Sequence, residues 1–328
     1  MIFNRKFFSK IAKGDLVLSS HYEKLLYLLE SDIDCSVRAS IWFSEENING
    51  FAPICLSSDL ESAKFYNQLP SYFKFVDSSI IHSQNIYYNN GGYYPLDCSS
   101  IFMASPLFYI MDREQIASAV DLCASPGGKT AAIKRVFPHA TLLSNESVGG
   151  RIPALLSNIK RMRFDNIMLS RAKISNYSNS FCNFFDLVFL DVPCSGQSMV
   201  FAGQQNDGCF NPIVINRCAK IQRALLQESS NIVKSNGYVI YSTCTFSKEE
   251  NEEVVESFLS KNKNFELVEL TYLSEFESAN LPRTYKLLPS FGFGLGGFTA
   301  LLRCKDQELE TKSDYENIGL MEIYYEEK

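Results

Sequence analysis

Two cysteines occupy positions at which a thiol could act as a nucleophile. Cys194 follows the apolar run 186–190 and Asp191, and Cys244 follows the apolar run 238–241. Both runs are predicted strands, and the carboxyl ends of parallel strands meet along one edge of a sheet, where ligands bind. A thiolate there could attack an electrophilic carbon while Asp191 handles a proton. Most cysteines are simply small buried hydrophobic residues, so either thiol alone would be weak support for catalysis.

A glycine-rich loop between a predicted strand and a predicted helix is a second candidate site. Residues 121–130 read D-L-C-A-S-P-G-G-K-T. Glycines let backbone N–H groups approach a ligand closely, and the start of a helix favours an anionic group such as a carboxylate. The spacing excludes a P-loop. Taken alone, a Gly-Gly turn before a helix is as often a tight connection.

Glu146 lies at the end of the next predicted strand. An acidic residue in this position typically accepts hydrogen bonds from a ribose. A single glutamate is more often just exposed on the surface, so the position gains weight only beside the other motifs.

The elements that must position these residues alternate between strands and helices from about residue 115 onward. This alternation predicts an α/β fold with a doubly wound, mostly parallel sheet and helices on both faces. We expect strands at 116–122, 141–144, 167–169, 186–190 and 238–241, and helices at 130–137, 149–163 and 216–234.

The chain divides into three predicted parts. Residues 1–112 are expected to form a smaller α+β domain that orients the substrate, and residues 113–304 the catalytic domain. Residues 305–328 are rich in acidic side chains, and we expect a solvated tail.

Three helix starts are also predicted. Ser20 is expected to cap a helix over 20–30, and another helix is expected from Ser99. Ser247 and Glu250 have the spacing of a capping box for a helix over 249–259, and we interpret both as structural.

Composition narrows the class of protein. Hydrophobic residues make up 46% of the 328 residues, so a sizeable core is expected, and the net charge of −6 argues against a generally basic nucleic-acid binder. Ten cysteines without a C-x-x-C pair, and only three histidines, disfavour a disulfide scaffold and a metal site. The sequence has neither a signal-peptide pattern nor an apolar stretch of about 20 residues. We therefore expect a cytoplasmic monomer without membrane association.

The motifs D-L-C-A-S-P-G-G-K-T, D-V-P-C-S-G and Y-S-T-C-T together resemble those of the Sun family of RNA 5-methylcytosine methyltransferases, which includes bacterial RsmB and RsmF. Their order and spacing also fit, and the resemblance covers roughly residues 35 to 304. It implies the Rossmann-like class I methyltransferase fold and S-adenosylmethionine as the cofactor. Further similar segments lie at 36–38, 93–100, 143–160, 221–223, 286–289 and 297–300.

The resemblance also implies a role for each motif residue. Cys244 would attack C6 of a cytosine, and Asp191 would hydrogen-bond the ring at N3. Cys194 would assist removal of the C5 proton and release of the enzyme, with Lys129 near Asp191. The residues implied to hold the cofactor are Cys123, Ala124, Ser125, Pro126, Gly127, Gly128, Lys129, Glu146, Arg151 and Asp191.

Cysteine suits this chemistry because cytosine C5 is too weakly nucleophilic to take a methyl group directly. Addition of a thiolate at C6 makes an enamine whose C5 is electron-rich. The base must leave its stack to reach such a pocket. Family analogy points to RNA, with 16S ribosomal RNA as the first expectation and transfer RNA as the alternative.

Two departures from the family pattern keep a second class of function open, a catalytically decayed RNA-binding assembly factor. Lys173 stands where relatives carry an Asp near the adenine, and a lysine cannot accept from its amino group. Ser170 could substitute for that Asp. The basic run usual in relatives is absent from 201–207. The intact motif cysteines and Asp191 favour an active enzyme.

A local excess of basic residues could contact RNA phosphates, although the chain as a whole is acidic. Between residues 129 and 173 only Glu146 and Asp165 are acidic, and the alternative is that part of this excess is a solvated helix face. The aromatic residues Tyr87, Tyr88, Tyr93 and Tyr94 could stack on bases or pack in the core. The basic residues are Lys129, Lys134, Arg135, Arg151, Lys160, Arg161, Arg163, Arg171 and Lys173.

Overall fold

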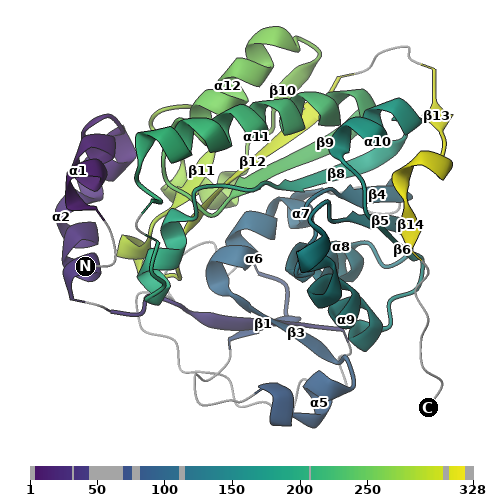
Figure 1. Cartoon of the computed structure of the whole chain (residues 1–328), viewed down its shortest axis with the longest axis horizontal. Helices are drawn as coiled ribbons and strands as arrows, with labels where there is room; N and C mark the ends of the chain where they lie inside the picture. The colour runs from purple at the N-terminus through teal and green to yellow at the C-terminus, as the bar shows by residue number, and fades with distance from the viewer. Residues whose placement is uncertain are drawn as a thin grey trace.

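The computed structural model describes residues 4–31, 33–43, 69–75, 82–110, 115–206, 208–305 and 310–321. A nine-stranded sheet forms its centre, in the order β10-β12-β9-β8-β4-β5-β6-β14 with β11 paired to β12 (Figure 1). Its parallel strands are β4 (Ser118–Asp121), β5 (Thr141–Asn145), β6 (Ile167–Ser170), β8 (Phe185–Asp191) and β9 (Val233–Thr243). Its antiparallel strands are β10 (Phe265–Leu267), β11 (Tyr285–Leu287), β12 (Gly297–Cys304) and β14 (Leu320–Met321). The predicted doubly wound, mostly parallel α/β fold is confirmed.

Helices cover both faces of the sheet because successive strand residues point in opposite directions. Ala119 and Leu142 belong to one hydrophobic cluster, whereas their neighbours Val120 and Leu143 belong to the other. Figure 1 shows the two helical layers on either side of the sheet. The first layer holds α6 (Cys98–Ala104), α7 (Pro106–Tyr109), α8 (Gly128–Val136) and α9 (Ile152–Met162), and the second holds α10 (Ile174–Ser180), α11 (Pro212–Ile232) and α12 (Glu252–Lys261).

A small antiparallel sheet lies under the first helical layer. Two arginines attach it to the rest of the protein: Arg135 Nε donates to the carbonyl of Trp42 at 2.7 Å, and Arg161 Nη1 donates to the carbonyl of Tyr93 at 3.0 Å. Tyr93 and Tyr94 are buried, so these two rings pack in the interior. The sheet has the order β2-β1-β3, with β1 at Arg38–Trp42, β2 at Phe73–Phe75 and β3 at Tyr93–Asp97, and the short helix α5 (Ile86–Asn89) precedes β3.

Two N-terminal helices, α1 (Arg5–Lys13) and α2 (Leu16–Glu30), pack beside the second layer. A fully buried ion triad anchors them. Lys286 Nζ lies 2.8 Å from Asp15 Oδ2 and 2.9 Å from Glu252 Oε1. Glu252 is the first residue of α12. The triad therefore joins the start of α2 to the end of the segment 245–252, which follows Cys244.

The predicted N-caps of α2 and α12 were both wrong. Asp15, and not Ser20, caps α2 by accepting from the N–H groups of Val17 and Leu18. The capping box at 247–250 does not form either, since α12 begins only at Glu252. The helix predicted from Ser99 begins one residue earlier, at Cys98.

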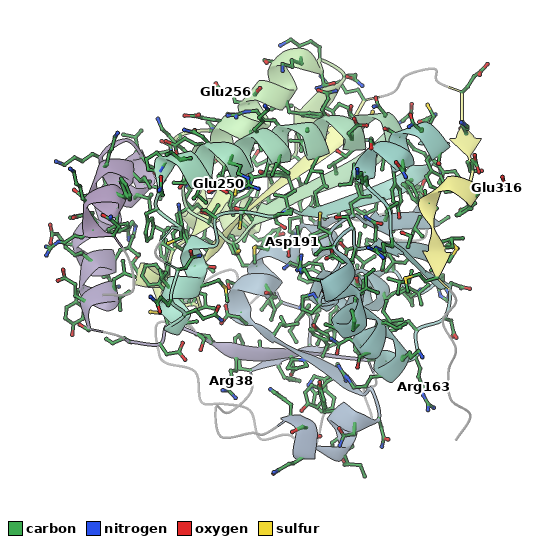
Figure 2. The ribbon with its side chains drawn as sticks, in the orientation of Figure 1. Arg38, Arg163, Asp191, Glu250, Glu256 and Glu316 are labelled. Atoms are coloured by element: carbon green, nitrogen blue, oxygen red, sulfur yellow. The ribbon has the colours of Figure 1, made fainter. Side chains whose placement is uncertain are left out.

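The acidic C-terminal stretch is not wholly solvated, contrary to our expectation. Its residues Lys312–Ser313 form β13, which pairs with β7 (Phe181–Cys182), and β14 extends the central sheet beside β6. Ile318 is fully buried, whereas Glu316 is exposed at the right-hand edge of Figure 2. None of the described helices combines the length and apolarity that crossing a bilayer requires.

Candidate active site

The structure brings the two motif cysteines together where β8 and β9 end. The sulfur atoms of Cys194 and Cys244 lie 3.0 Å apart, and both residues are partly exposed. Asp191, the last residue of β8, lies near the centre of the molecule in Figure 2. Its Oδ2 accepts from Lys129 Nζ at 3.0 Å and its Oδ1 accepts from the Ser242 hydroxyl at 3.0 Å. Three strand ends therefore place two thiols, a carboxylate and an ammonium group in one site.

The environment makes the two thiols unequal. A hydrogen bond from the Cys194 thiol lowers the pKa of Cys244, with burial opposing and Lys129 assisting. The same contact and burial raise the pKa of Cys194 well above its ordinary value. Cys244 is consequently the thiol that ionises first, and the thiolate is the reactive form of a cysteine.

Glu250 connects the loop that contains Cys194 to the segment 245–252 that follows Cys244. Its Oε2 accepts from the backbone N–H of Ser195 at 2.9 Å and from Gln222 Nε2 at 3.0 Å, and its Oε1 accepts from the Ser195 hydroxyl at 2.5 Å. Gln222 Nε2 also donates to the carbonyl of Pro193 at 2.9 Å. Burial raises the pKa of Glu250. These contacts join the two cysteine segments, and Glu250 does not form the predicted helix cap.

Gln197 makes a second connection between the same segments. Its Oε1 accepts from the N–H groups of Phe246 and Ser247 at 2.9 and 3.1 Å, and its Nε2 donates to the carbonyl of Cys209. The side chain is fully buried. Sequence reasoning missed Gln197 because its partners lie about 50 residues away and no local pattern marks it.

The glycine-rich loop lies between β4 and α8 and contacts the turn after β5. Gly127 has a φ of +117°, a conformation that residues with a Cβ rarely adopt. The Ser125 hydroxyl donates to the carbonyl of Arg151 at 2.9 Å, and Arg151 Nη2 donates back to the Ser125 carbonyl at 2.5 Å. Cys123 lies in the same loop, and burial raises its pKa well above the ordinary value, so it remains a thiol.

Two buried carboxylates lie at this edge, Asp121 at the end of β4 and Glu146 just after β5. Asp121 Oδ1 receives no hydrogen bond from any described residue. Glu146 Oε2 lies 3.1 Å from Arg151 Nη1, and its Oε1 accepts from the N–H of Val148. Burial raises the pKa of Asp121 to about 7. An unfilled buried acceptor needs a donor, which a hydroxyl or ammonium group of a bound ligand would supply.

Asp121 was absent from the predicted site residues, although it opens the glycine-rich motif. Its position as the last residue of a buried strand was the signal that could have found it. Its Oδ2 accepts from the Thr130 hydroxyl at 2.8 Å, which ties the strand end to the start of α8.

Ser170 is not available to replace the acidic residue that Lys173 displaces. Its hydroxyl is fully buried, donates to Asn145 Oδ1 at 3.1 Å and contacts the hydroxyl of Tyr177. Lys173 is exposed, directly before α10. The predicted substitution by Ser170 is therefore wrong.

The predicted basic patch is smaller than the sequence suggested. Lys129 pairs with Asp191, Lys134 donates to the carbonyl of Ala140, and Arg135 and Arg161 hold the small sheet. The basic residues that remain exposed are Arg151, Lys160, Arg163, Arg171 and Lys173. Arg163 lies at the lower right of the molecule in Figure 2. Within the described ranges, no cluster of histidine, cysteine or acidic side chains could hold a metal ion.

Comparison with known proteins places this geometry in a family. Residues 108–303 match the family described as 16S rRNA methyltransferase RsmB/F. Ribosomal RNA small subunit methyltransferase F of Pectobacterium carotovorum is 31% identical over 166 residues, which cover 50% of this chain and 34% of that protein. Probable ribosomal RNA small subunit methyltransferase B of Coxiella burnetii is 30% identical over 210 residues, covering 63% and 48%. The chain thus spans between a third and a half of these relatives.

Two solved structures share the fold. A methyltransferase homolog protein from Pyrococcus horikoshii has a TM-score of 0.71 at 18% identity, covering 92% of this chain and 96% of that chain. NSun6 from Pyrococcus horikoshii, solved with SFG, has a TM-score of 0.60 at 23% identity, covering 72% and 59%.

Proposed function

Because the chain belongs to the 16S rRNA methyltransferase RsmB/F family, as its resemblance to the Sun family predicted, we propose that it methylates C5 of a cytosine in RNA, with S-adenosylmethionine as the methyl donor. The substrate we favour is 16S ribosomal RNA, with residues 1–112 orienting it in the cytoplasm. The observation that carries the proposal is the contact between Cys194 and Cys244 beside Asp191. Covalent catalysis at a pyrimidine needs a nucleophile and a proton-handling partner on one site.

Cys244 begins the reaction, because its pKa is the lowered one of the pair. Its sulfur bonds to C6 of the cytosine, and the electron pair of the C5–C6 double bond moves towards C5. Asp191, held by Lys129 and Ser242, supports the proton that N3 acquires as negative charge develops on the ring.

S-adenosylmethionine, when bound, supplies an electrophilic methyl group. The loop at Cys123–Lys129 would hold its methionine part, Glu146 its ribose, and Arg151 would keep Glu146 in place. The unfilled oxygen of Asp121 and the buried carboxylate of Glu146 support this assignment.

Cys194 completes the cycle. After C5 has gained the methyl group, the C5 proton leaves with assistance from Cys194, and the bond between C6 and the Cys244 sulfur breaks. Once Cys194 has given up its own proton, its raised pKa makes the thiolate a strong base, which suits removal of the C5 proton.

The alternative of a decayed RNA-binding factor is motivated by Lys173, for which Ser170 offers no replacement. Transfer RNA remains the alternative substrate.

Transfer of labelled methyl from S-adenosylmethionine to RNA from a cytosine-methylase-deficient bacterium tests the proposal, with Cys244→Ala as the control. Label that digests to 5-methylcytidine, absent with Cys244→Ala, is the expected result. No label on free RNA or ribosomal subunits would favour the decayed factor, and calorimetry that finds no bound cofactor would support it further.

A further inference from the structure

The segment 310–321 crosses the edge of the central sheet next to the cofactor side of the site. In β14, Leu320 pairs with Ser170 and Met321 pairs with Leu169, both in antiparallel register. Ile318 is fully buried in the cluster that also contains Tyr177. Figure 1 shows this segment running beside α10 and ending next to β6. Without β14, β6 would be an edge strand of the central sheet.

A second set of contacts holds the start of the segment. Lys312 Nζ donates to the carbonyl of Asn179 at 2.7 Å, and β13 pairs with β7. The ring of Tyr315 packs edge-on against Phe181, with 5.1 Å between centroids. The segment is thus fixed at both ends of α10 and is not a loosely attached tail.

The segment contacts the loop 170–173 directly. The N–H of Arg171 donates to the carbonyl of Gly319 at 3.1 Å. Gly319 has a φ of +58°, and a Cβ there would lie 3.1 Å from the carbonyl oxygen of Arg171. On the inner side of the loop, Asn145 accepts from the N–H of Ala172 at 2.9 Å and donates to its carbonyl at 3.1 Å. The loop 170–173 is therefore held on one side by Asn145, the neighbour of Glu146, and on the other side by the segment 310–321.

The side chain of Arg171 connects this contact to the turn beside Glu146, the residue proposed to hold the ribose. A Cβ added to Gly149 would lie 2.9 Å from Arg171 Nη2, so the guanidinium lies directly against that glycine. Gly149 begins the turn Gly149–Arg151, whose last residue pairs with Glu146. A continuous chain of contacts runs from Gly319 through Arg171 to Glu146.

The direction in which the cofactor would lie follows from the sheet order. The methyl group would have to reach the cysteines after β8 and β9, with the methionine part held at the loop after β4 and the ribose at Glu146 after β5. The base would then extend towards the next strand, β6, and its loop 170–173. Lys173 offers no hydrogen-bond acceptor there, which leaves recognition of the adenine to the backbone and apolar atoms of that loop.

We propose that the segment 310–321 is part of the cofactor site and positions the loop 170–173 that binds the adenine. The inference rests on the proposed use of S-adenosylmethionine. It assigns to the C-terminal segment a binding role that the family match, which ends at residue 303, does not include.

Calorimetry with two ligands tests the proposal in the full-length protein. S-adenosylhomocysteine has the whole cofactor skeleton, whereas 5′-methylthioadenosine has the adenosine without the amino-acid part. Gly319→Val puts a branched side chain against Arg171 at a positive φ. We expect this substitution to lower the affinity for both ligands by the same factor, about tenfold. Gly292→Val is the matched control, since Gly292 has a φ of +83° but nothing within 4 Å of its Cβ position; it should leave both affinities unchanged.

The alkylation rate of Cys244 is measured on the same samples to separate positioning from unfolding. An unchanged rate in Gly319→Val, with weaker binding of both ligands, supports the proposal. Unchanged affinities, a loss confined to S-adenosylhomocysteine, or a parallel loss of thiol reactivity would each overturn it. A wild-type protein that binds neither ligand would instead overturn the proposed use of the cofactor. A chain that stops at residue 309, if it folds, should show at least the same loss as Gly319→Val.

Discussion

Cys194 and Cys244 are 50 residues apart in the chain, yet their sulfur atoms lie 3.0 Å from each other. The contact favours a thiolate on Cys244, because a thiol of raised pKa donates to a thiol of lowered pKa. Substitutions of Cys194, Cys244 and Glu250 test consequences of this contact, whereas those of Asp121 and Lys173 test the proposed cofactor side of the site.

Removing the donor should raise the pKa of the nucleophile. In Cys194→Ala, Cys244 loses the hydrogen bond that is the largest cause of its lowered pKa, so its alkylation by iodoacetamide should begin at a higher pH than in the wild type. Mass spectrometry of the peptide containing Cys244 measures the rate at each pH. An unchanged pH profile would contradict the hydrogen bond as the cause.

The same substitution should trap the reaction. Without Cys194 the enzyme cannot readily release the methylated base, so a covalent complex with RNA should accumulate as a shifted band on a denaturing gel. Cys244→Ala should show neither this band nor methyl transfer. A band that forms only in Cys244→Ala would mean that the two cysteine roles are exchanged.

Loss of the Glu250 carboxylate should loosen the cysteine pair. Glu250→Ala leaves the Ser195 N–H and the Gln222 amide without their acceptor, at a cost of about 2–4 kcal/mol in the free energy of unfolding. The milder Glu250→Gln should lower the rate of methyl transfer by about tenfold or more while the cofactor affinity stays constant. Urea denaturation and single-turnover kinetics measure these effects.

Glu256→Ala is the matched control for Glu250, since Glu256 is exposed on α12, away from Asp191 and Glu250 in Figure 2. It should be neutral in both measurements. An equal effect of the two substitutions would show that Glu250 acts through general stability or charge.

Asp121 should make stability depend on pH. Its folded-state pKa of about 7 lies above its value in the unfolded chain, so the folded protein holds a proton that the unfolded chain releases. This contribution is fully present below about pH 4 and is lost as the pH rises to about 7 and above. Relative to Asp121→Asn, the wild type should therefore lose up to about 4 kcal/mol of unfolding free energy over that range. Urea titrations at several pH values test this, and a constant difference would contradict the raised pKa.

Lys173→Asp should strengthen cofactor binding if the position lies beside the adenine. A new acceptor for the amino group would contribute about 1 kcal/mol, or roughly a fivefold lower Kd for S-adenosylhomocysteine by calorimetry. Lys160→Asp makes the same charge change on the exposed face of α9 and should have little effect. Weaker or equal binding in Lys173→Asp would place the adenine elsewhere.

Local patterns in the sequence were sufficient to predict the parallel strands and the motifs that follow them. An apolar run followed by Asp191 or by Cys244 reports a buried strand and its carboxyl end within a few residues, and every parallel sheet gathers such ends at one edge. The glycines of the loop after β4 carry the same kind of local information. The fold, the family and the meeting of the two cysteines follow from features that each occupy about ten residues.

Only the tertiary structure decided which distant side chains hold that edge in place. Glu250 looked like a helix cap because its spacing from Ser247 matched a local rule, yet it hydrogen-bonds Ser195, which lies 55 residues away. Gln197 had no signal at all, and the acidic composition of the C-terminal stretch hid a strand that pairs with β6. Hydrogen bonds across such separations depend on where the folded chain returns. A buried donor takes whichever acceptor lies nearest in space, and no local pattern of residues specifies that choice.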